Sequence, residues 1–315
     1  MRMTKWLLLL LLLPAGLAGQ GCCSGGTPLS GSLGLETLTA KQWQIELMLD
    51  YNTQSTLVSG GSKLEDNPRN RLTYAGLLRL SYAFSNRWSL TGLLSWVRQE
   101  EKIDRIAGGT TTIRAQGPGD LMLLTQYAVL QGKRYSLLAG AGIELPTGET
   151  SDANPDTGIP FHPDMQAGRG AVACLGSTLF TYNGVLRPSG NVFAQATYRI
   201  SSSAERYERL QSYQFGNELR LLTGYSDQLL IGEQLFAPSL MLLYRHTQKD
   251  LLNGLPSPNT GGQWLHLRTG LQWAVTPKIE IRSFVEWPLA WQLEGTQLTT
   301  TLRARLSIRY QWYAK

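Results

Sequence analysis

The stretch that decides the fold is QLTTTLRARLSIRYQW, residues 297–312, close to the C-terminus. Every second residue from Leu298 onward is mostly apolar, whereas the residues between them are mostly hydroxylated or charged. This period of two predicts one long strand, Gln297–Trp312, with an apolar face and a wet face. Ordinary globular strands run only about 5–6 residues. A membrane β-barrel wall has lipid on one side and water on the other, so the stretch predicts a strand of such a wall.

The composition also suits a barrel wall better than a soluble domain. Charged residues make up 17% of the chain, below the roughly 25% of a typical soluble domain. Glycine is plentiful (33 of 315 residues), as are Trp (9) and Tyr (13), which is typical of barrels with glycine kinks and aromatic girdles. The net charge is only +6, and we find no Lys/Arg run or nucleic-acid-binding module. We therefore predict no nucleic-acid partner.

The N-terminus has the pattern of an export signal. Residues 1–5 include the basic Arg2 and Lys5, 6–13 are apolar, and 14–19 are mostly small. This segment is too short to span a bilayer as a helix. We predict a signal peptide at 1–19, a periplasmic tail at 20–40 and a barrel at 41–315. Export without a helical span predicts the outer membrane of a Gram-negative bacterium. The expected partners are membrane lipid, the outer-membrane insertion machinery and a small-molecule solute.

Cys22 and Cys23 follow the predicted cleavage region and allow three interpretations. Lipid attachment fits badly, because Gly19-Gln20-Gly21 precedes Cys22 where an aliphatic residue is expected. A metal-binding pair would lack a nearby His or second Cys pair. Incidental thiols in a flexible tail are the simplest interpretation. We predict no metal and no cofactor.

Eleven further segments alternate in the same way and bring the prediction to about twelve strands, with ten or fourteen as alternatives. They are Lys41–Asn52, Leu72–Phe84, Trp88–Gln99, Gly119–Leu130, Tyr135–Pro146, Arg169–Phe180, Asn191–Ile200, Tyr213–Thr223, Leu229–Thr247, Gln263–Val275 and Lys278–Gln292. An even number places both termini in the periplasm. The connections mostly alternate long and short, as in outer-membrane barrels, although 293–296 is short where a long one is expected. The predicted fold is therefore all-β, a single antiparallel up-and-down transmembrane barrel.

A soluble β-sandwich would also alternate, but its outer faces would carry many charges. Here the predicted outer faces carry almost no charges, and nearly all the charged residues fall on the other face of each strand. We therefore predict that this face lines a wet lumen. The candidate lumen-lining residues are Arg79, Glu144, Glu218, Arg220, Arg245, Arg268, Glu280, Arg282, Arg303, Arg305 and Arg309.

The arginine ladder Arg303, Arg305 and Arg309 needs carboxylate partners or water, because an unpaired buried cation is costly. Its candidate partners are Glu280, Glu286, Glu144 and Glu218. Two hypotheses remain open for this ladder. It forms a charged constriction that selects ions or solutes, or it belongs to a structural salt-bridge network that fills a narrow barrel.

The histidines are the candidates for catalysis or metal binding. His266 is predicted to point inward and His246 to lie near an outer rim. An outer-membrane phospholipase would need a Ser, a His and an orienting polar residue together, and no local motif supplies them, so we predict no enzyme. His162, Asp164 and Asp156 share one loop, but Asp in a Pro/Gly-rich loop usually makes turns.

Two short motifs lie on successive predicted strands. They are Gly117-Pro118-Gly119-Asp120 and, after Tyr127, the run from Gly142 to Glu149 with Pro146-Thr147-Gly148. In these motifs the chain resembles an outer-membrane family labelled as belonging to the meta-pathway of phenol degradation, whose members tend to show Gly-x-Gly-Asp and Pro-Thr-Gly at these places. The resemblance covers residues 117–149. It implies a barrel that moves small, including aromatic, compounds, and it assigns no functional residues.

The function predicted from the sequence is a channel for passive movement of small solutes, with small aromatic or anionic compounds as candidate cargo. The alternative is a non-conducting barrel that is structural or binds a partner through its outer loops. Large side chains that point inward and fill the interior, such as Phe193, Phe284 and Leu222, would favour the alternative.

Overall fold

The computed structural model describes residues 38–104, 108–155, 157–207 and 211–314. The predicted signal peptide, most of the predicted tail with Cys22 and Cys23, and Asp156 lie outside these residues. Within the described part of the chain the elements are strands and one short 3-10 helix, η2 (Pro163–Met165). In that part, no helix has the length and apolar character needed to cross a membrane.

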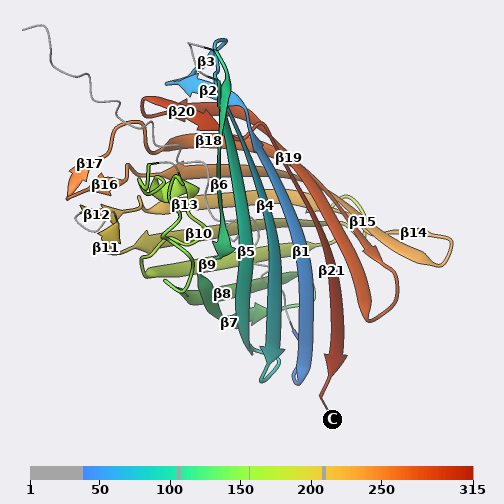
Figure 1. Ribbon diagram of the computed structural model, residues 1–315. Helices are drawn as coiled ribbons and strands as arrows, with labels where there is room; N and C mark the ends of the chain where they lie inside the picture. The colour runs from blue at the N-terminus through green and yellow to red at the C-terminus, as the bar shows by residue number, and fades with distance from the viewer. Residues whose placement is uncertain (1–37, 105–107, 156, 208–210, 315) are drawn as a thin grey trace, which may run out of the picture.

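Twelve antiparallel strands close into a barrel (Figure 1). Each pairs with its neighbours along the chain, and β1 pairs with β21 to close the ring. The all-β up-and-down barrel and the count of about twelve are therefore confirmed. The wall strands are β1 (Gln42–Gln54), β4 (Arg69–Ala83), β5 (Trp88–Asp104), β7 (Leu121–Gln131), β8 (Tyr135–Leu145), β9 (Ala173–Asn183), β10 (Asn191–Ser201), β13 (Glu218–Ser226), β15 (Gln234–Thr247), β18 (Gly262–Ala274), β19 (Ile279–Leu293) and β21 (Leu302–Tyr313).

The connections at the two ends of the barrel differ consistently in length. At the end that holds the C-terminus they are short: 84–87, 132–134, 184–190, 227–233 and 275–278. At the other end they are long: 55–68, 105–120, 146–172, 202–217, 248–261 and 294–301. Because short turns face the periplasm in outer-membrane barrels, the end with the C-terminus is the periplasmic end, and we call the other end the outer end.

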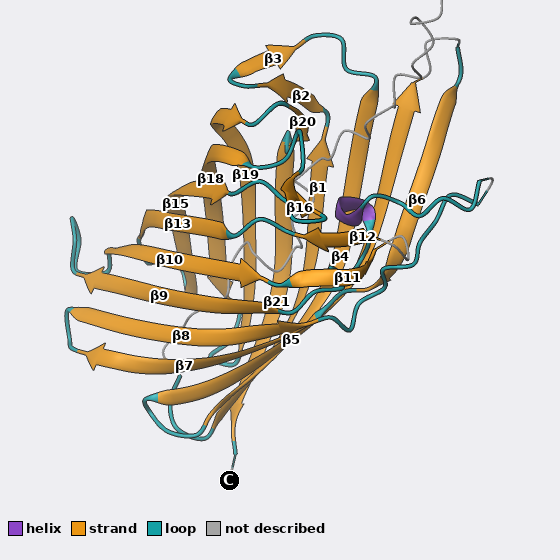
Figure 2. Ribbon diagram, turned by 90° about the vertical axis from the view of Figure 1, so that its left-hand side faces the viewer, coloured by secondary structure: helices purple, strands orange, loops and turns teal. Residues whose placement is uncertain are grey.

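Small elements extend the barrel at its outer end (Figures 1 and 2). The strands β2 (Thr56–Ser59), β3 (Ser62–Leu64) and β20 (Thr296–Thr299) form one sheet. A second sheet contains β11 (Ser203–Tyr207), β12 (Gln211–Gln214), β16 (Leu251–Leu252) and β17 (Leu255–Pro256). The strand β6 (Thr110–Pro118) pairs with the outer half of β5. At the periplasmic end, β14 (Leu229–Ile231) forms a hairpin with β15.

The two faces of the wall differ sharply in side-chain exposure. On β1, Leu47 and Leu49 are 61% and 68% exposed, whereas Glu46 and Asp50 are each 4% exposed. In a soluble protein, leucines of a strand are usually buried and carboxylates are usually exposed to solvent. In a barrel that crosses a membrane the exposed leucines meet lipid, and the carboxylates lie inside.

The predicted strand Gln297–Trp312 is wrong in one respect, because it is two strands. β20 leaves the wall to pair with β2, and the wall strand β21 begins only at Leu302. At the break, the backbone N–H of Thr301 donates to the carbonyl of Thr53. Leu298, predicted to face lipid, is fully buried in the outer-end sheet. The short connection 293–296 is thereby explained, since the true connection is 294–301.

Three other boundaries also differ from the prediction. The segment 100–118, predicted as a loop, contains the end of β5 and all of β6. The predicted strand Tyr213–Thr223 divides between β12 and β13, and Leu229–Thr247 divides between β14 and β15 at Gly232, whose φ is +61°. The alternation of apolar and polar residues continues through these breaks. It therefore cannot show where a strand ends and another with a different pairing partner begins.

Candidate functional site: the barrel lumen

Strand register builds a row of alternating charges inside the periplasmic half of the barrel. Glu46 on β1 lies opposite Arg79 of β4 on one side and Arg309 of β21 on the other. Arg309 in turn lies opposite Glu280 of β19. Directly opposed residues have Cβ atoms about 4.5–5.5 Å apart, within reach of each other's charges. Ion pairs join Arg79 to Glu46 and Arg309 to Glu280, so positive and negative charges alternate across four strands.

Asp50 holds two members of the predicted arginine ladder further towards the outer end. Its carboxylate accepts hydrogen bonds from Nε of Arg303 at 3.0 Å and from Nε of Arg305 at 2.8 Å. Asp50 is 4% exposed, so this is a desolvated, charge-assisted cluster. The ladder was predicted to pair with glutamates. Arg309 does pair with Glu280, whereas Arg303 and Arg305 hydrogen-bond to an aspartate that the sequence did not single out.

The other carboxylates of the lumen also contact arginines. Glu286 accepts from Nε of Arg268 at 2.8 Å, and Glu280 pairs with Arg282 as well as with Arg309. On the adjacent side of the barrel, Glu218 is surrounded by three arginines. It lies 2.5 Å from Arg220, 2.9 Å from Arg245 and 3.6 Å from Arg199.

Arginines outnumber carboxylates on the described inner faces of the wall strands. The arginines are Arg69, Arg71, Arg79, Arg199, Arg220, Arg245, Arg268, Arg282, Arg303, Arg305 and Arg309, and the carboxylates are Glu46, Asp50, Glu101, Glu144, Glu218, Glu280 and Glu286. All eleven residues that we predicted to line the lumen are in this set. The described inner faces of the wall strands therefore carry an excess of positive charge.

The opposite part of the interior is apolar. From β4 to β9 the inward side chains form one hydrophobic cluster that includes Leu77, Leu93, Leu124, Leu138 and Leu175. These residues have the same inward parity as the charged residues of the other strands. The lumen is therefore divided lengthwise into two sides. We call β10, β13, β15, β18, β19, β21 and β1 the charged side, and β4, β5, β7, β8 and β9, whose inward charges lie mostly towards the strand ends, the apolar side.

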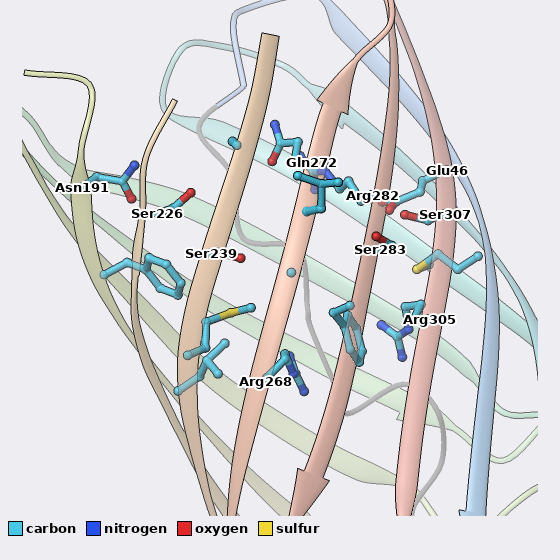
Figure 3. Close-up of a pocket in the computed structure, with 18 of the residues that line it drawn as sticks. Glu46, Asn191, Ser226, Ser239, Arg268, Gln272, Arg282, Ser283, Arg305 and Ser307 are labelled. Atoms are coloured by element: carbon cyan, nitrogen blue, oxygen red, sulfur yellow. The ribbon is translucent and has the colours of Figure 1, made fainter. Parts of the chain in front are cut away.

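A cavity of about 350 Å³ lies against the charged side in the periplasmic half (Figure 3). Arg268, Arg282 and Arg305 point into it from three neighbouring strands (Figure 3). Phe284 also lines it and packs under two guanidinium groups, with its ring centroid 4.3 Å from Cζ of Arg268 and 5.2 Å from Cζ of Arg305. Phe193 lines the cavity too, so these two aromatic side chains border an open space.

The loop 146–172 enters the outer half of the barrel and is fixed there by ion pairs. Asp164 lies 2.7 Å from Nη1 of Arg71, which also pairs with Glu101 at 3.0 Å. Nδ1 of His162 lies 2.7 Å from the other oxygen of Asp164. Burial by itself would lower the pKa of His162, but the charge and hydrogen bond of Asp164 outweigh it and raise the pKa above its ordinary value. His162 and Asp164 therefore hold the loop in place through these contacts, in addition to any role in forming a turn.

Asp120 joins the two ends of the same loop, near Gly148 and Arg169, at a place that we call the neck of the loop. One of its carboxylate oxygens accepts from the backbone N–H of Gly148 at 2.9 Å, and the other from that of Arg169 at 2.8 Å. The two loop segments that meet here are so close that a Cβ on Gly148 would lie 2.6 Å from Cα of Gly168. The two motifs that carried the family resemblance, Gly-Pro-Gly-Asp and Pro-Thr-Gly, therefore meet at this neck.

Several important residues were not found from the sequence. Arg71 falls in a segment predicted as a loop, and Arg199 and Asp50, although they lie in predicted strands, were not among the candidate residues. The signal available in the sequence was their position on the inward-facing side of the alternating pattern, because charged residues on that side must find partners.

His266 is buried inside as predicted and is 4% exposed. In the described residues no three or more His, Cys, Asp or Glu side chains are grouped to hold a metal ion.

Comparison with known proteins gives the fold. No protein-family model matches the sequence, and no curated protein matches it either. The structure is similar to the crystal structure of an outer membrane channel from Pseudomonas putida F1, with a TM-score of 0.66, 15% identity, and coverage of 88% of this chain and 97% of that chain. It is also similar to the β domain of the Bordetella autotransporter BrkA, with a TM-score of 0.51, 11% identity, and coverage of 86% and 100%. At these sequence identities the two similarities establish the fold. This chain has the fold of an outer-membrane β-barrel, an architecture that channels also use.

Proposed function

We propose that this protein lies in the outer membrane of a Gram-negative bacterium and lets small solutes, preferentially anions, diffuse passively through its lumen. Support comes from the closed barrel, its exposed outer leucines and its buried charges. The resemblance to the phenol-degradation family adds small aromatic compounds to the candidate cargo.

The observation that carries this proposal is the cavity beside the charged side of the lumen. Its walls carry arginines from β4, β18, β19 and β21, among them Arg268, Arg282 and Arg305. Fixed positive charges beside a space of about 350 Å³ would lower the energy of an anion there more than that of a cation.

The second candidate function is a non-conducting barrel that is structural or binds a partner at its outer end. One observation favours it. The apolar cluster of β4 to β9 packs side chains inside the barrel, and the loop 146–172 adds Ala167 to that cluster. A lumen filled in this way leaves less room for solutes.

Single-channel recording in a planar bilayer tests the proposal. We expect the refolded protein to give discrete conductance steps, and a salt gradient to give a reversal potential that indicates anion preference. Arg305→Gln should move the reversal potential towards zero. Asp50 keeps its hydrogen bond to Arg303 in this variant, so the site loses one charge without losing its other pair.

Arg114→Gln is the matched control. It removes the same charge from β6, where Arg114 pairs with Glu100 on the outward face, and it should leave the reversal potential unchanged. A protein that is folded by circular dichroism but never conducts would overturn the proposal and favour the second candidate.

A further inference from the structure

We propose that the cavity in the periplasmic half of the lumen is a binding site for a small aromatic carboxylate. This inference rests on the proposed function only in taking the lumen as the route of the solute. The cavity volume, about 350 Å³, lies at the lower end of the roughly 300–1,000 Å³ of small-molecule sites. It therefore suits a ligand with one ring and a short acidic side chain.

The charges around the cavity select an anion. Four arginines line it, and Glu46 is the one carboxylate among its described lining residues. The carboxylates that hold Arg268 and Arg305, which are Glu286 and Asp50, are outside the lining. Arg268 and Arg305 therefore line the cavity, whereas the carboxylates that they pair with do not. A planar ligand carboxylate matches the planar donors of a guanidinium group.

The apolar lining selects the rest of the ligand. Phe193, Leu222 and Met241 line the cavity together with Phe284, which supports the two guanidinium groups. A ring placed among these side chains would bury apolar surface and contact the Met241 thioether, which packs well against aromatic rings. An inorganic anion would leave this lining unused, and a pure hydrocarbon would desolvate the arginines without compensation. An acid with one aromatic ring satisfies both parts of the lining.

The first experiment compares ligands on the unmodified protein. The refolded protein in zwitterionic micelles is titrated with 4-fluorophenylacetate, and binding is followed by ¹⁹F NMR against protein-free micelles. Two control ligands separate the two parts of the lining: 4-fluorophenylacetamide keeps the ring without the charge, and trifluoroacetate keeps the charge without the ring. We expect saturable binding of the acid, with each control at least tenfold weaker. If the neutral amide binds as tightly as the acid, the proposal is overturned.

The second experiment compares two arginines that share one partner. Arg303 and Arg305 both hydrogen-bond to Asp50, but of the two only Arg305 lines the cavity. Arg305→Gln should weaken binding of 4-fluorophenylacetate at least tenfold, and Arg303→Gln less than twofold. Equal losses in the two variants would show that the ion-pair network matters and the cavity does not, and would also overturn the proposal.

A third variant keeps the test decisive if Arg305→Gln does not fold. Phe284→Leu retains an apolar side chain and removes the ring, so it should weaken 4-fluorophenylacetate several-fold and leave trifluoroacetate unchanged. Unchanged binding of the aromatic acid would overturn the role given to the ring. Because binding is measured without a bilayer, a barrel that binds but does not conduct would reject the proposed function alone. A barrel that conducts but does not bind would reject this inference alone.

Discussion

The charged and apolar sides of the lumen are built from strands of the same kind, but they are specified differently. On the charged side, some partners are far apart in sequence: Asp50 and Arg305 are separated by 255 positions, and they meet because β1 pairs with β21 in one register. On the apolar side, residues such as Leu77 and Leu124 need only volume and inward parity. Ion pairs are directional and costly to leave incomplete, whereas hydrophobic contact is not directional. The comparison shows that one barrel interior can depend on register on one side and on packing on the other.

The largest effect is expected where the charged side is densest. Glu218→Gln removes the carboxylate shared by Arg199, Arg220 and Arg245. Breaking a buried ion-pair cluster leaves charges uncompensated, so we expect a loss of about 3–5 kcal/mol in the free energy of unfolding. Denaturant unfolding in micelles, followed by tryptophan fluorescence, measures it.

Glu100→Gln provides the comparison for this variant. Glu100 lies on the outward face of β5 and pairs with Arg114, so its loss should change the unfolding midpoint little. If Glu218→Gln is equally mild, water in the lumen solvates the arginines, and the charged side is a wet surface with no packed network.

The next effect tests the apolar side by packing. Leu124 is 2% exposed and belongs to the inward cluster of β4 to β9. Leu124→Ala should cost about 2–4 kcal/mol of unfolding free energy, because it removes buried methyl groups and leaves a cavity. Leu94→Ala on the lipid face, where Leu94 is 51% exposed, should cost less, since lipid chains can fill the space. Equal losses of unfolding free energy in the two variants would mean that the side chains of the apolar side are not packed against one another.

The smallest effect concerns pH and the loop 146–172 at the outer end. The pKa of His162 is raised by Asp164 despite burial, so its contribution to loop docking is complete below about pH 6.5 and is lost as pH rises through the raised pKa. Burial opposes ionisation of Asp164, but Arg71 and His162 hold its pKa below its usual range. Its contribution is therefore present above about pH 4 and is lost on acidification.

The loop should thus be held most firmly between about pH 4 and pH 6.5. Hydrogen exchange of the amides in residues 159–167, corrected for the intrinsic pH dependence of exchange, should show a few-fold loss of protection from pH 5.5 to pH 8.5. His162→Gln should remove most of this difference. A pH difference that persists in His162→Gln would assign the effect to another group and contradict this prediction.

Much of the charged site could be predicted, but its pairing could not. The inward direction of Arg303, Arg305 and Arg309 follows from a period of two, which holds for any strand. Their partners depend on which strands are neighbours and on the register between them, and a slip of one residue would put every side chain on the opposite face. Asp50 lies in the predicted strand Lys41–Asn52, but the sequence did not identify it as the partner of Arg303 and Arg305.

The sequence by itself determined the all-β class, a count of about twelve wall strands, the face of most charged residues in the predicted strands and the general alternation of short and long connections. These are local properties, set by alternation and by the residues of turns. Only the tertiary structure decided where β20 leaves the wall, how Asp120 closes the loop neck, which arginine meets which carboxylate, and that the lumen is apolar on one side. Those features depend on contacts between distant segments, which arise when the sheet closes and brings β1 beside β21.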